Sequence, residues 1–139
     1  MSYVAPTAKV SGNAMVIGNA YVFDHARVCG NARVSGNADV SGNAKVSGNA
    51  EVSDHAQIGG SAIVSDNAVA YDYAWIDDKA KLGGHAQISG NVHVYGNAVV
   101  AGNASVSDYA IVEGQSILEG DVTISSGHIR DLHWWKDVP

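Results

Sequence analysis

The sequence predicts an all-β fold, a single-stranded parallel β-solenoid of about seven triangular coils, each made of three hexapeptides. First, an apolar residue recurs at every sixth position from Val4 to Ile124, which gives 21 hexads without an insertion or deletion. Second, Ala fills the fifth position of nearly all of these hexads. Third, the chain has one Phe and is rich in small residues, so it suits a stack of small repeated layers better than a conventional core.

Each hexad has the pattern of a short strand followed by a corner. In Ala8-Lys9-Val10-Ser11, alternation places Ala8 and Val10 on the inner face, and Lys9 and Ser11 on the outer face. Gly12-Asn13 suits a sharp corner, because Gly accepts any backbone angle and Asn tolerates the left-handed region. Three hexads close one coil, and strands of successive coils pair in parallel. Seven coils would form a prism roughly 34 Å long.

The end of the chain departs from this pattern. Residues 1–129 are predicted to form the solenoid, and residues 130–139 a short C-terminal tail that caps the last coil. Trp134 and Trp135 would cover the apolar end of that coil, which otherwise leaves an open strand edge.

The pattern [LIV]-[GAS]-x-x-A-x over residues 4–129 resembles the hexapeptide-repeat, left-handed parallel β-helix proteins. The left hand is implied by this resemblance alone, because the general rule for parallel crossovers favours the right hand. Runs rich in Ala-x-Val-x-Gly-Asn look most like the uncharacterised transferase-like hexapeptide proteins of bacteria and phages. The family includes trimeric acyltransferases, γ-class carbonic anhydrases and proteins without known activity, so the resemblance implies a fold more than a function.

Outward side chains sort into three faces when they are counted in steps of three hexads. In the C-terminal half, the first and third faces meet at the corners Asp78-Lys79, Gly96-Asn97 and Gly114-Gln115. Apolar and aromatic residues cluster around these corners, and a contiguous set of this kind is unusual on a monomer. The cluster comprises Ile63, Trp75, Tyr95, Val99, Ile111, Ile117 and Ile129, with His93 beside Tyr95. We expect a subunit interface here, with a homotrimer favoured; the alternative is that the C-terminal tail folds back over it.

Two further irregularities have open interpretations. Met15, Ile17, Tyr21 and Phe23 cluster on the first coil, as a second contact surface or as a terminal layer. Ala70 replaces a larger residue at a core position. Either a neighbouring aromatic side chain refills the space, or the space remains as a dent.

Charge and cysteine content narrow the functional classes. The net charge is −6, and it is uneven: residues 1–52 hold four basic and three acidic residues, whereas the remainder holds four basic and eleven acidic. No basic groove with interleaved aromatics is evident, which argues against nucleic-acid binding. The single Cys29 is compatible with a reducing compartment, and neither a signal peptide nor a membrane span is evident. We expect a cytoplasmic protein without membrane partners.

The histidines do not form a convincing metal site. His25, His55 and His85 fall on different corners or distant coils. His128 and His133 have the five-residue spacing of γ-class carbonic anhydrases, but His128 is expected to point inward and His133 lies in the tail. Corner aspartates are expected to accept hydrogen bonds from corner amides instead of binding calcium. No metal or cofactor is predicted.

The sequence therefore favours a non-catalytic oligomeric β-helix, a scaffold or binding protein that engages a partner protein or small ligand through its C-terminal half. The predicted contact residues are Trp75, His93, Tyr95, Val99, Ile111 and Ile117. A phage-related, inhibitory or sequestering role rests on the resemblance alone. The alternative is a trimeric acyl-CoA-dependent acyltransferase with His93 as general base, although no loop interrupts the hexads to build a substrate pocket.

Overall fold

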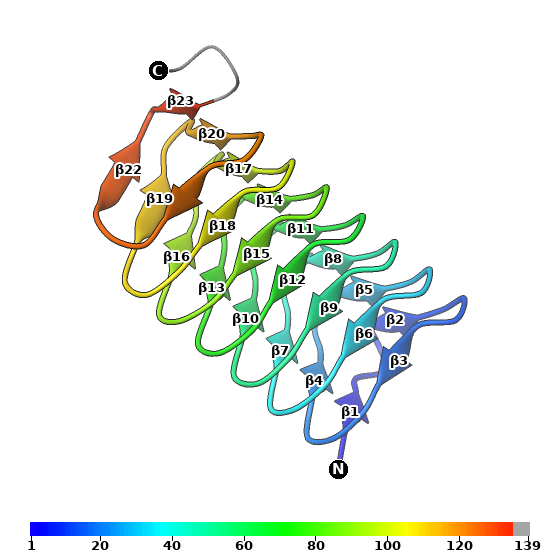
Figure 1. Cartoon of the computed structure of the whole chain (residues 1–139). Coiled ribbons are helices and arrows are strands. Elements are labelled where there is room, and N and C mark those ends of the chain that lie inside the picture. Colours follow the sequence, from blue (N-terminus) through cyan, green and yellow to red (C-terminus); the bar gives the residue numbers. More distant parts are fainter. Residues whose placement is uncertain (135–139) are drawn as a thin grey trace.

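The computed structural model describes residues 1–134, the last of these by its backbone only, and shows a parallel β-solenoid built from three sheets (Figure 1). Sheet A contains β1 (Tyr3–Val4), β4 (Tyr21–Val22), β7 (Asp39–Val40), β10 (Gln57–Ile58), β13 (Trp75–Ile76), β16 (His93–Val94), β19 (Ile111–Glu113) and β22 (His128–Arg130). Sheet B contains β2 (Lys9–Val10), β5 (Arg27–Val28), β8 (Lys45–Val46), β11 (Ile63–Val64), β14 (Lys81–Leu82), β17 (Val99–Val100), β20 (Ile117–Leu118) and β23 (His133–Trp134). Sheet C contains β3 (Met15–Val16), β6 (Arg33–Val34), β9 (Glu51–Val52), β12 (Val69–Ala70), β15 (Gln87–Ile88), β18 (Ser105–Val106) and β21 (Thr123–Ile124).

The predicted coil of three hexads is confirmed by the strand register. Tyr21 pairs with Asp39 and Val22 with Val40, and all these strand pairs are parallel. Corners pair as well as strands, since the amide of Asn13 donates to the carbonyl of Gly30 at 2.8 Å. Residues 1–134 contain no helix, and so no helix that could cross a membrane.

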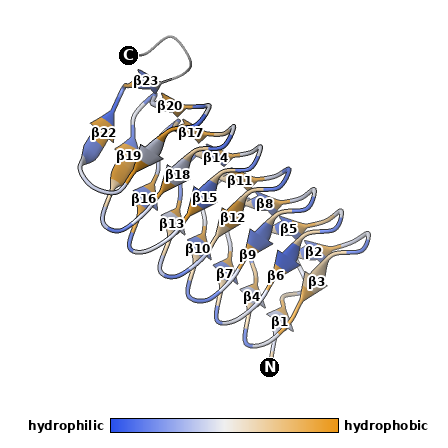
Figure 2. Ribbon diagram, viewed as in Figure 1, coloured by the Kyte–Doolittle hydropathy of each residue, from blue (hydrophilic) through white to orange (hydrophobic). Residues whose placement is uncertain are grey.

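The interior consists of the alternating Ala and Val side chains that the hexad predicts. Ala44 and Val46 are fully buried, and the same is true of their equivalents in most coils. Ser116 replaces Ala at one inward position, where its hydroxyl donates to the carbonyl of Glu113 at 2.8 Å and accepts from the amide of Leu132 at 3.2 Å. Both of its interactions offset the cost of burying a polar group. Outward positions vary: Figure 2 shows β6 and β9 strongly hydrophilic and β12 hydrophobic on the same sheet.

The sharp corner depends on the third residue of the hexad, which takes a positive φ in every hexad except the first and the last, where it is Pro6 and Ser126; the Asn that often follows it does not. This residue is Gly in most hexads, as at Gly36 with φ 65°, and Asp in several others, as at Asp72 with φ 58°. The predicted hydrogen bonds of the aspartates are confirmed for five of them. A carboxylate oxygen of Asp24, Asp54, Asp66, Asp72 and Asp78 accepts a hydrogen bond from the equivalent corner amide of the next coil. These bonds tie each corner to the coil that follows it.

Ala70 is fully buried, but it is not covered by a refilling aromatic from Tyr73 or Trp75. Both rings are exposed on the outer surface. The irregularity in the interior and the aromatics outside it are therefore separate features.

The last coil corrects the sequence-based register. Ile111 pairs with His128 and Val112 with Ile129, so this coil is one residue shorter than the coil before it, in which His93 pairs with Ile111. The prediction that His128 points inward and Ile129 outward is wrong: His128 is exposed, and Ile129 packs against the core. The cause is a shorter corner after β21, in which Gly127, the fourth residue of its hexad, adopts the positive φ of 94°.

A second residue is lost at the following corner. Asp131 takes the positive φ of 55°, and Leu132 leads directly into β23, so that Ile117 pairs with His133. Residues 130–134 of the predicted tail thus continue sheets A and B (Figure 1). Trp135 and the side chain of Trp134, which were expected to cap the coil, lie outside the described residues.

Candidate functional site

An aromatic stack lies on the outer face of sheet A. Trp75 and His93 are register partners on the neighbouring strands β13 and β16, and their rings stack with centroids 4.4 Å apart and planes 10° apart. Tyr95 also contacts the imidazole, with ring centroids 4.3 Å apart and planes 34° apart. His93 therefore contacts two aromatic rings. The three residues were predicted to share one surface, and the structure brings them into contact.

Burial controls the protonation of His93. Its Nε2 is shielded from solvent and has no hydrogen-bond partner among the described residues. This desolvation lowers the pKa of His93, although the negative charges of Asp77, Asp78 and Glu113 oppose the effect. The neutral imidazole is accordingly favoured, and it acts as a flat ring between Trp75 and Tyr95.

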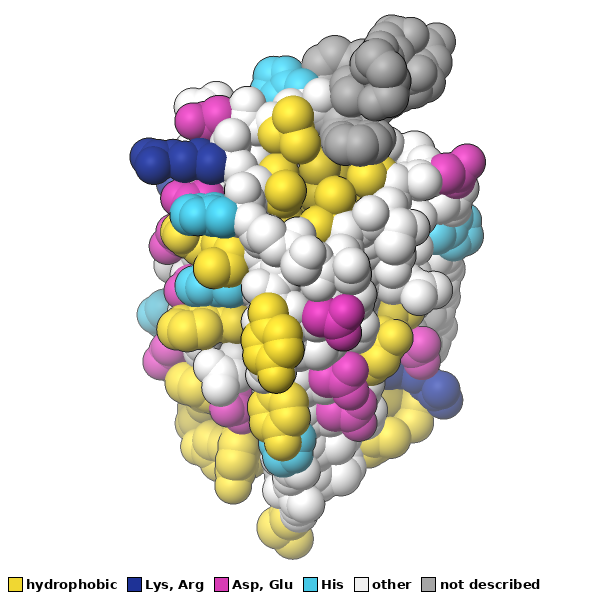
Figure 3. Space-filling model, turned by 60° about the vertical axis from the view of Figure 1, so that its left-hand side comes forward, with side chains coloured by type: hydrophobic (Ala, Val, Ile, Leu, Met, Phe, Trp, Pro, Cys, Tyr) yellow, Lys and Arg dark blue, Asp and Glu magenta, His cyan; other side chains and the backbone are white. Residues whose placement is uncertain are grey.

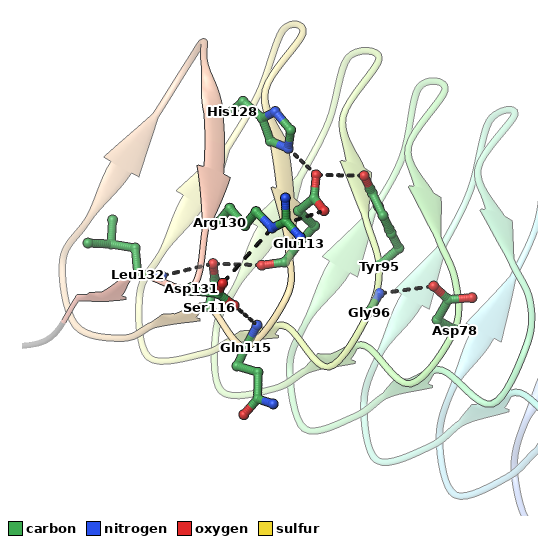
Figure 4. A network of polar contacts seen from close by, with 10 residues as sticks. All are labelled: Asp78, Tyr95, Gly96, Glu113, Gln115, Ser116, His128, Arg130, Asp131 and Leu132. Atoms are coloured by element: carbon green, nitrogen blue, oxygen red, sulfur yellow. Dashed lines mark hydrogen bonds and ion pairs between the residues drawn. The ribbon is translucent and has the colours of Figure 1, made fainter.

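A polar network continues the stack towards the end of the solenoid (Figure 4). The Tyr95 hydroxyl donates to Glu113 Oε2 at 2.7 Å, and His128 Nε2 contacts the same carboxylate oxygen. Arg130 Nε lies 3.9 Å from Glu113 Oε1 and the same distance from an oxygen of Asp131. Hydrogen bonds from Tyr95 and His128 lower the pKa of Glu113, and the bond to Glu113 raises the pKa of Tyr95. The network holds the hydroxyl of Tyr95, whose ring contacts His93.

Only part of this network could be expected from the sequence. Tyr95 and Glu113 are three hexads apart, which is the spacing that places outward side chains on adjacent strands. The same spacing joins His55 and Tyr73, whose rings stack at 4.9 Å and 4° on the corner between sheets C and A. His128 was missed because it reaches Glu113 only through the shortened corner after β21.

The other predicted contact residues flank this stack. Ile111 follows His93 in register on sheet A, and Val99 pairs with Ile117 on sheet B; all three are half-buried. The corner between the two sheets holds an open hollow of about 370 Å³. It is lined by Gly60, Ser61, Asp78, Lys79, Gly96 and Asn97. Ile129, which was expected in this set, is partly buried and packs against the core instead.

The structure also separates the candidate metal ligands. His25, His55 and His85 lie on three different corners, and among residues 1–134 no three His, Cys, Asp or Glu side chains form a group that could hold a metal ion. Figure 3 shows hydrophobic and histidine side chains alternating along one side of the molecule, with acidic ones among them. Such a surface suits contacts with another molecule more than metal chemistry.

Comparison with known proteins supports the fold class. Residues 8–23, 26–42 and 86–102 match a family model described as the YdcK β-solenoid repeat. These segments make up about a third of the chain, and the third one contains His93, Tyr95 and Val99. No curated protein matches the sequence. The chain is thus a repetitive β-solenoid protein whose repeat is similar to that of the YdcK solenoid.

Proposed function

We propose that this protein is a non-catalytic, homo-oligomeric binding protein, and that its C-terminal half forms the contact surface. The observation that carries the proposal is the stack of Trp75, His93 and Tyr95, which is ordered on the outside of the solenoid without serving its core. Side chains that are already fixed lose little conformational entropy on binding. Trp and Tyr are also the residue types that contribute most to binding energy at interfaces.

The corner between sheets A and B supports a second copy of the chain as the occupant of this surface. Apolar side chains lie on both sides of the corner, with Trp75 and Ile111 on sheet A and Ile117 on sheet B. Asp78 and Lys79 are adjacent and exposed, and Lys79 has no ion pair among the described residues. In a symmetric assembly, Lys79 of one copy can pair with Asp78 of another. A homotrimer, as the family resemblance implies, would use this corner in each subunit.

The hollow at the same corner gives the assembly a place for its ligand. Its volume of about 370 Å³ lies in the range of small-molecule pockets. A neighbouring subunit would close its open side and convert it into a cleft between subunits. A partner protein or a small molecule bound there would contact the side chains of Ser61, Lys79 and Asn97.

Sedimentation velocity across the micromolar range tests the proposal, using the wild type, Trp75→Ala and Ile117→Asp. Tyr109→Ala is the control, because it also removes an exposed aromatic ring, 75% exposed, but from the corner between sheets C and A. We expect a trimer for the wild type and the control, and dissociation for the other two. A wild type that stays monomeric throughout this range would overturn the proposed assembly.

The alternative of a trimeric acyl-CoA-dependent acyltransferase requires His93 to reach a substrate as a general base. Its Nε2 is shielded, and its ring contacts those of Trp75 and Tyr95. This geometry favours the binding role. Acyl transfer from acyl-CoA to a panel of amines, measured for the wild type and His93→Ala, separates the two functions. Activity that disappears in His93→Ala would replace our proposal with the transferase.

A further inference from the structure

A column of positive charges runs along sheet B in the N-terminal half, on the coils that precede the surface described above. Lys9 pairs in register with Arg27, and Arg27 with Lys45, so that three outward cations follow one another on β2, β5 and β8. Adjacent strands are about 4.8 Å apart. All three side chains are exposed, and none takes part in an ion pair among residues 1–134.

This arrangement is unfavourable for the isolated protein, because like charges directly opposite each other on adjacent strands destabilise a sheet. On sheet C, in the same coils, opposite charges instead lie in register on adjacent strands. There Arg33 is in register with Glu51, and their charged groups lie 4.0 Å apart. The repeat itself thus accepts an acidic residue in this position. On sheet B the outward positions of three successive coils remain basic.

A hollow opens beside two of these cations. It measures about 340 Å³ and is lined by His25, Arg27, Asn43, Lys45, Ser61 and Ile63. The lining offers hydrogen-bond donors from a guanidinium, an ammonium, an amide and a hydroxyl, and it includes no carboxylate from the described residues. The carboxylate of Asp24, at the adjoining corner, accepts a hydrogen bond from the amide of Gly42 at 3.1 Å. The hollow is therefore suited to an anion.

We propose that this hollow binds a small molecule that carries two or more linked phosphoryl groups. Arg27 can hold one phosphoryl group with two parallel hydrogen bonds, while Lys45 and Lys9 place further positive charges along the same line. Asn43 and Ser61 can donate to the remaining oxygens. His25 carries the one aromatic ring among the six lining residues, so the hollow lacks the row of rings on which successive bases stack, and a small oligophosphate fits it better than single-stranded nucleic acid.

Isothermal titration with inorganic tripolyphosphate tests the site in the wild type, Arg27→Gln and Lys45→Gln. Arg33→Gln is the matched control, because it removes the same charge from sheet C at the same level. We expect saturable binding with one site per chain. Each sheet B substitution should weaken the affinity about tenfold, because the free energy of the charge-assisted hydrogen bond that it removes corresponds to about that factor. The control should bind within about twofold of the wild type.

Two results would overturn the proposal: the absence of saturable binding, and an equal loss in Arg33→Gln, which would indicate only a general effect of net charge. A single-stranded oligonucleotide of matched charge provides the third arm. If it competes for the site and binds more tightly than tripolyphosphate, a polymer replaces the small molecule as the ligand.

Thermal unfolding adds an independent readout of the same column. Without ligand, Lys45→Gln should raise the midpoint, because it relieves repulsion from Arg27, whereas Arg33→Gln should lower it, because it breaks the pair with Glu51. With tripolyphosphate, the midpoint of the wild type should rise more than that of Lys45→Gln. Equal shifts in both proteins would contradict binding at this column.

Discussion

The regular coils around β5 to β9 and the coils from β13 to β22 have the same interior and different exteriors. Val46 on sheet B and Val94 on sheet A both occupy the first position of a hexad, and both are fully buried. On the outer surface of the regular coils, one ion pair among the described residues, between Arg33 and Glu51, joins side chains of successive coils. From β13 onward, ring contacts and hydrogen bonds connect such side chains continuously from Trp75 to His128.

This difference separates what forms the solenoid from what the solenoid presents. The interior requires only an apolar residue, an Ala and a corner in each hexad, so it leaves the outward positions free to vary. In a regular coil these positions hold solvated charges. In the C-terminal half they hold side chains that order one another, and ordering without a role in the core is what a contact surface requires.

The largest expected effects test whether the two interiors are equivalent. Val46→Ala in the regular coils and Val94→Ala under the aromatic stack should each lower the free energy of unfolding by about 2–3 kcal/mol, because each removes two buried methyl groups and leaves a cavity. Urea unfolding followed by circular dichroism measures both. A clearly larger cost at Val94 would show that the exterior stack also supports the core beneath it.

The fold could be predicted from the sequence because its determinants are periodic. The inward residues recur at every sixth position, and the corner residue is Gly or Asp at the third position. Both features have a local physical cause, the alternation of a strand and the left-handed region of the corner. The register of the last coil was not predicted, because the six-residue spacing holds up to Ile124 and the shortened corner comes only after it. The sequence signals this corner by Ser126 in place of Gly or Asp at the third position, Gly127 at the fourth and His128 in place of Ala at the fifth.

The candidate site was likewise predictable only where its contacts follow from the six-residue repeat. Trp75 and His93 are three hexads apart, so the count placed them on adjacent strands, and the structure stacks their rings. The contact between Glu113 and His128 depends instead on the shifted register of the last coil. The shielding of His93 Nε2 depends on how the neighbouring rings turn, which periodicity does not specify.

Substitutions at the corners should have a smaller effect on the free energy of unfolding. The corner residue is Gly in the regular coils and often Asp in the following coils. The carboxylate of Asp72 accepts a hydrogen bond from the amide of Gly90 at 3.0 Å. Asp72→Gly keeps the positive φ and loses this bond, so we expect a loss of about 1 kcal/mol in urea unfolding. Asp72→Ala also places an ordinary side chain in the left-handed region and should cost about 1 kcal/mol more. Equal stability of all three proteins would show that this bond contributes nothing and that the corner tolerates any residue.

The smallest effect is the pH dependence that arises from His93 in the C-terminal half. Because burial lowers the pKa of His93 in the folded protein, the unfolded chain binds a proton more readily as the pH falls below 6.5. The stability associated with neutral His93 is complete above this pH and is lost progressively below it. Urea unfolding between pH 7.5 and 5 should show this loss in the wild type, and His93→Phe, which keeps a ring between Trp75 and Tyr95, should reduce it. Trp75→Ala uncovers one face of the imidazole and should reduce it as well. A profile that is unchanged in both variants would assign the pH dependence to other groups, and His93 would then be no more shielded than the solvated side chains of the regular coils.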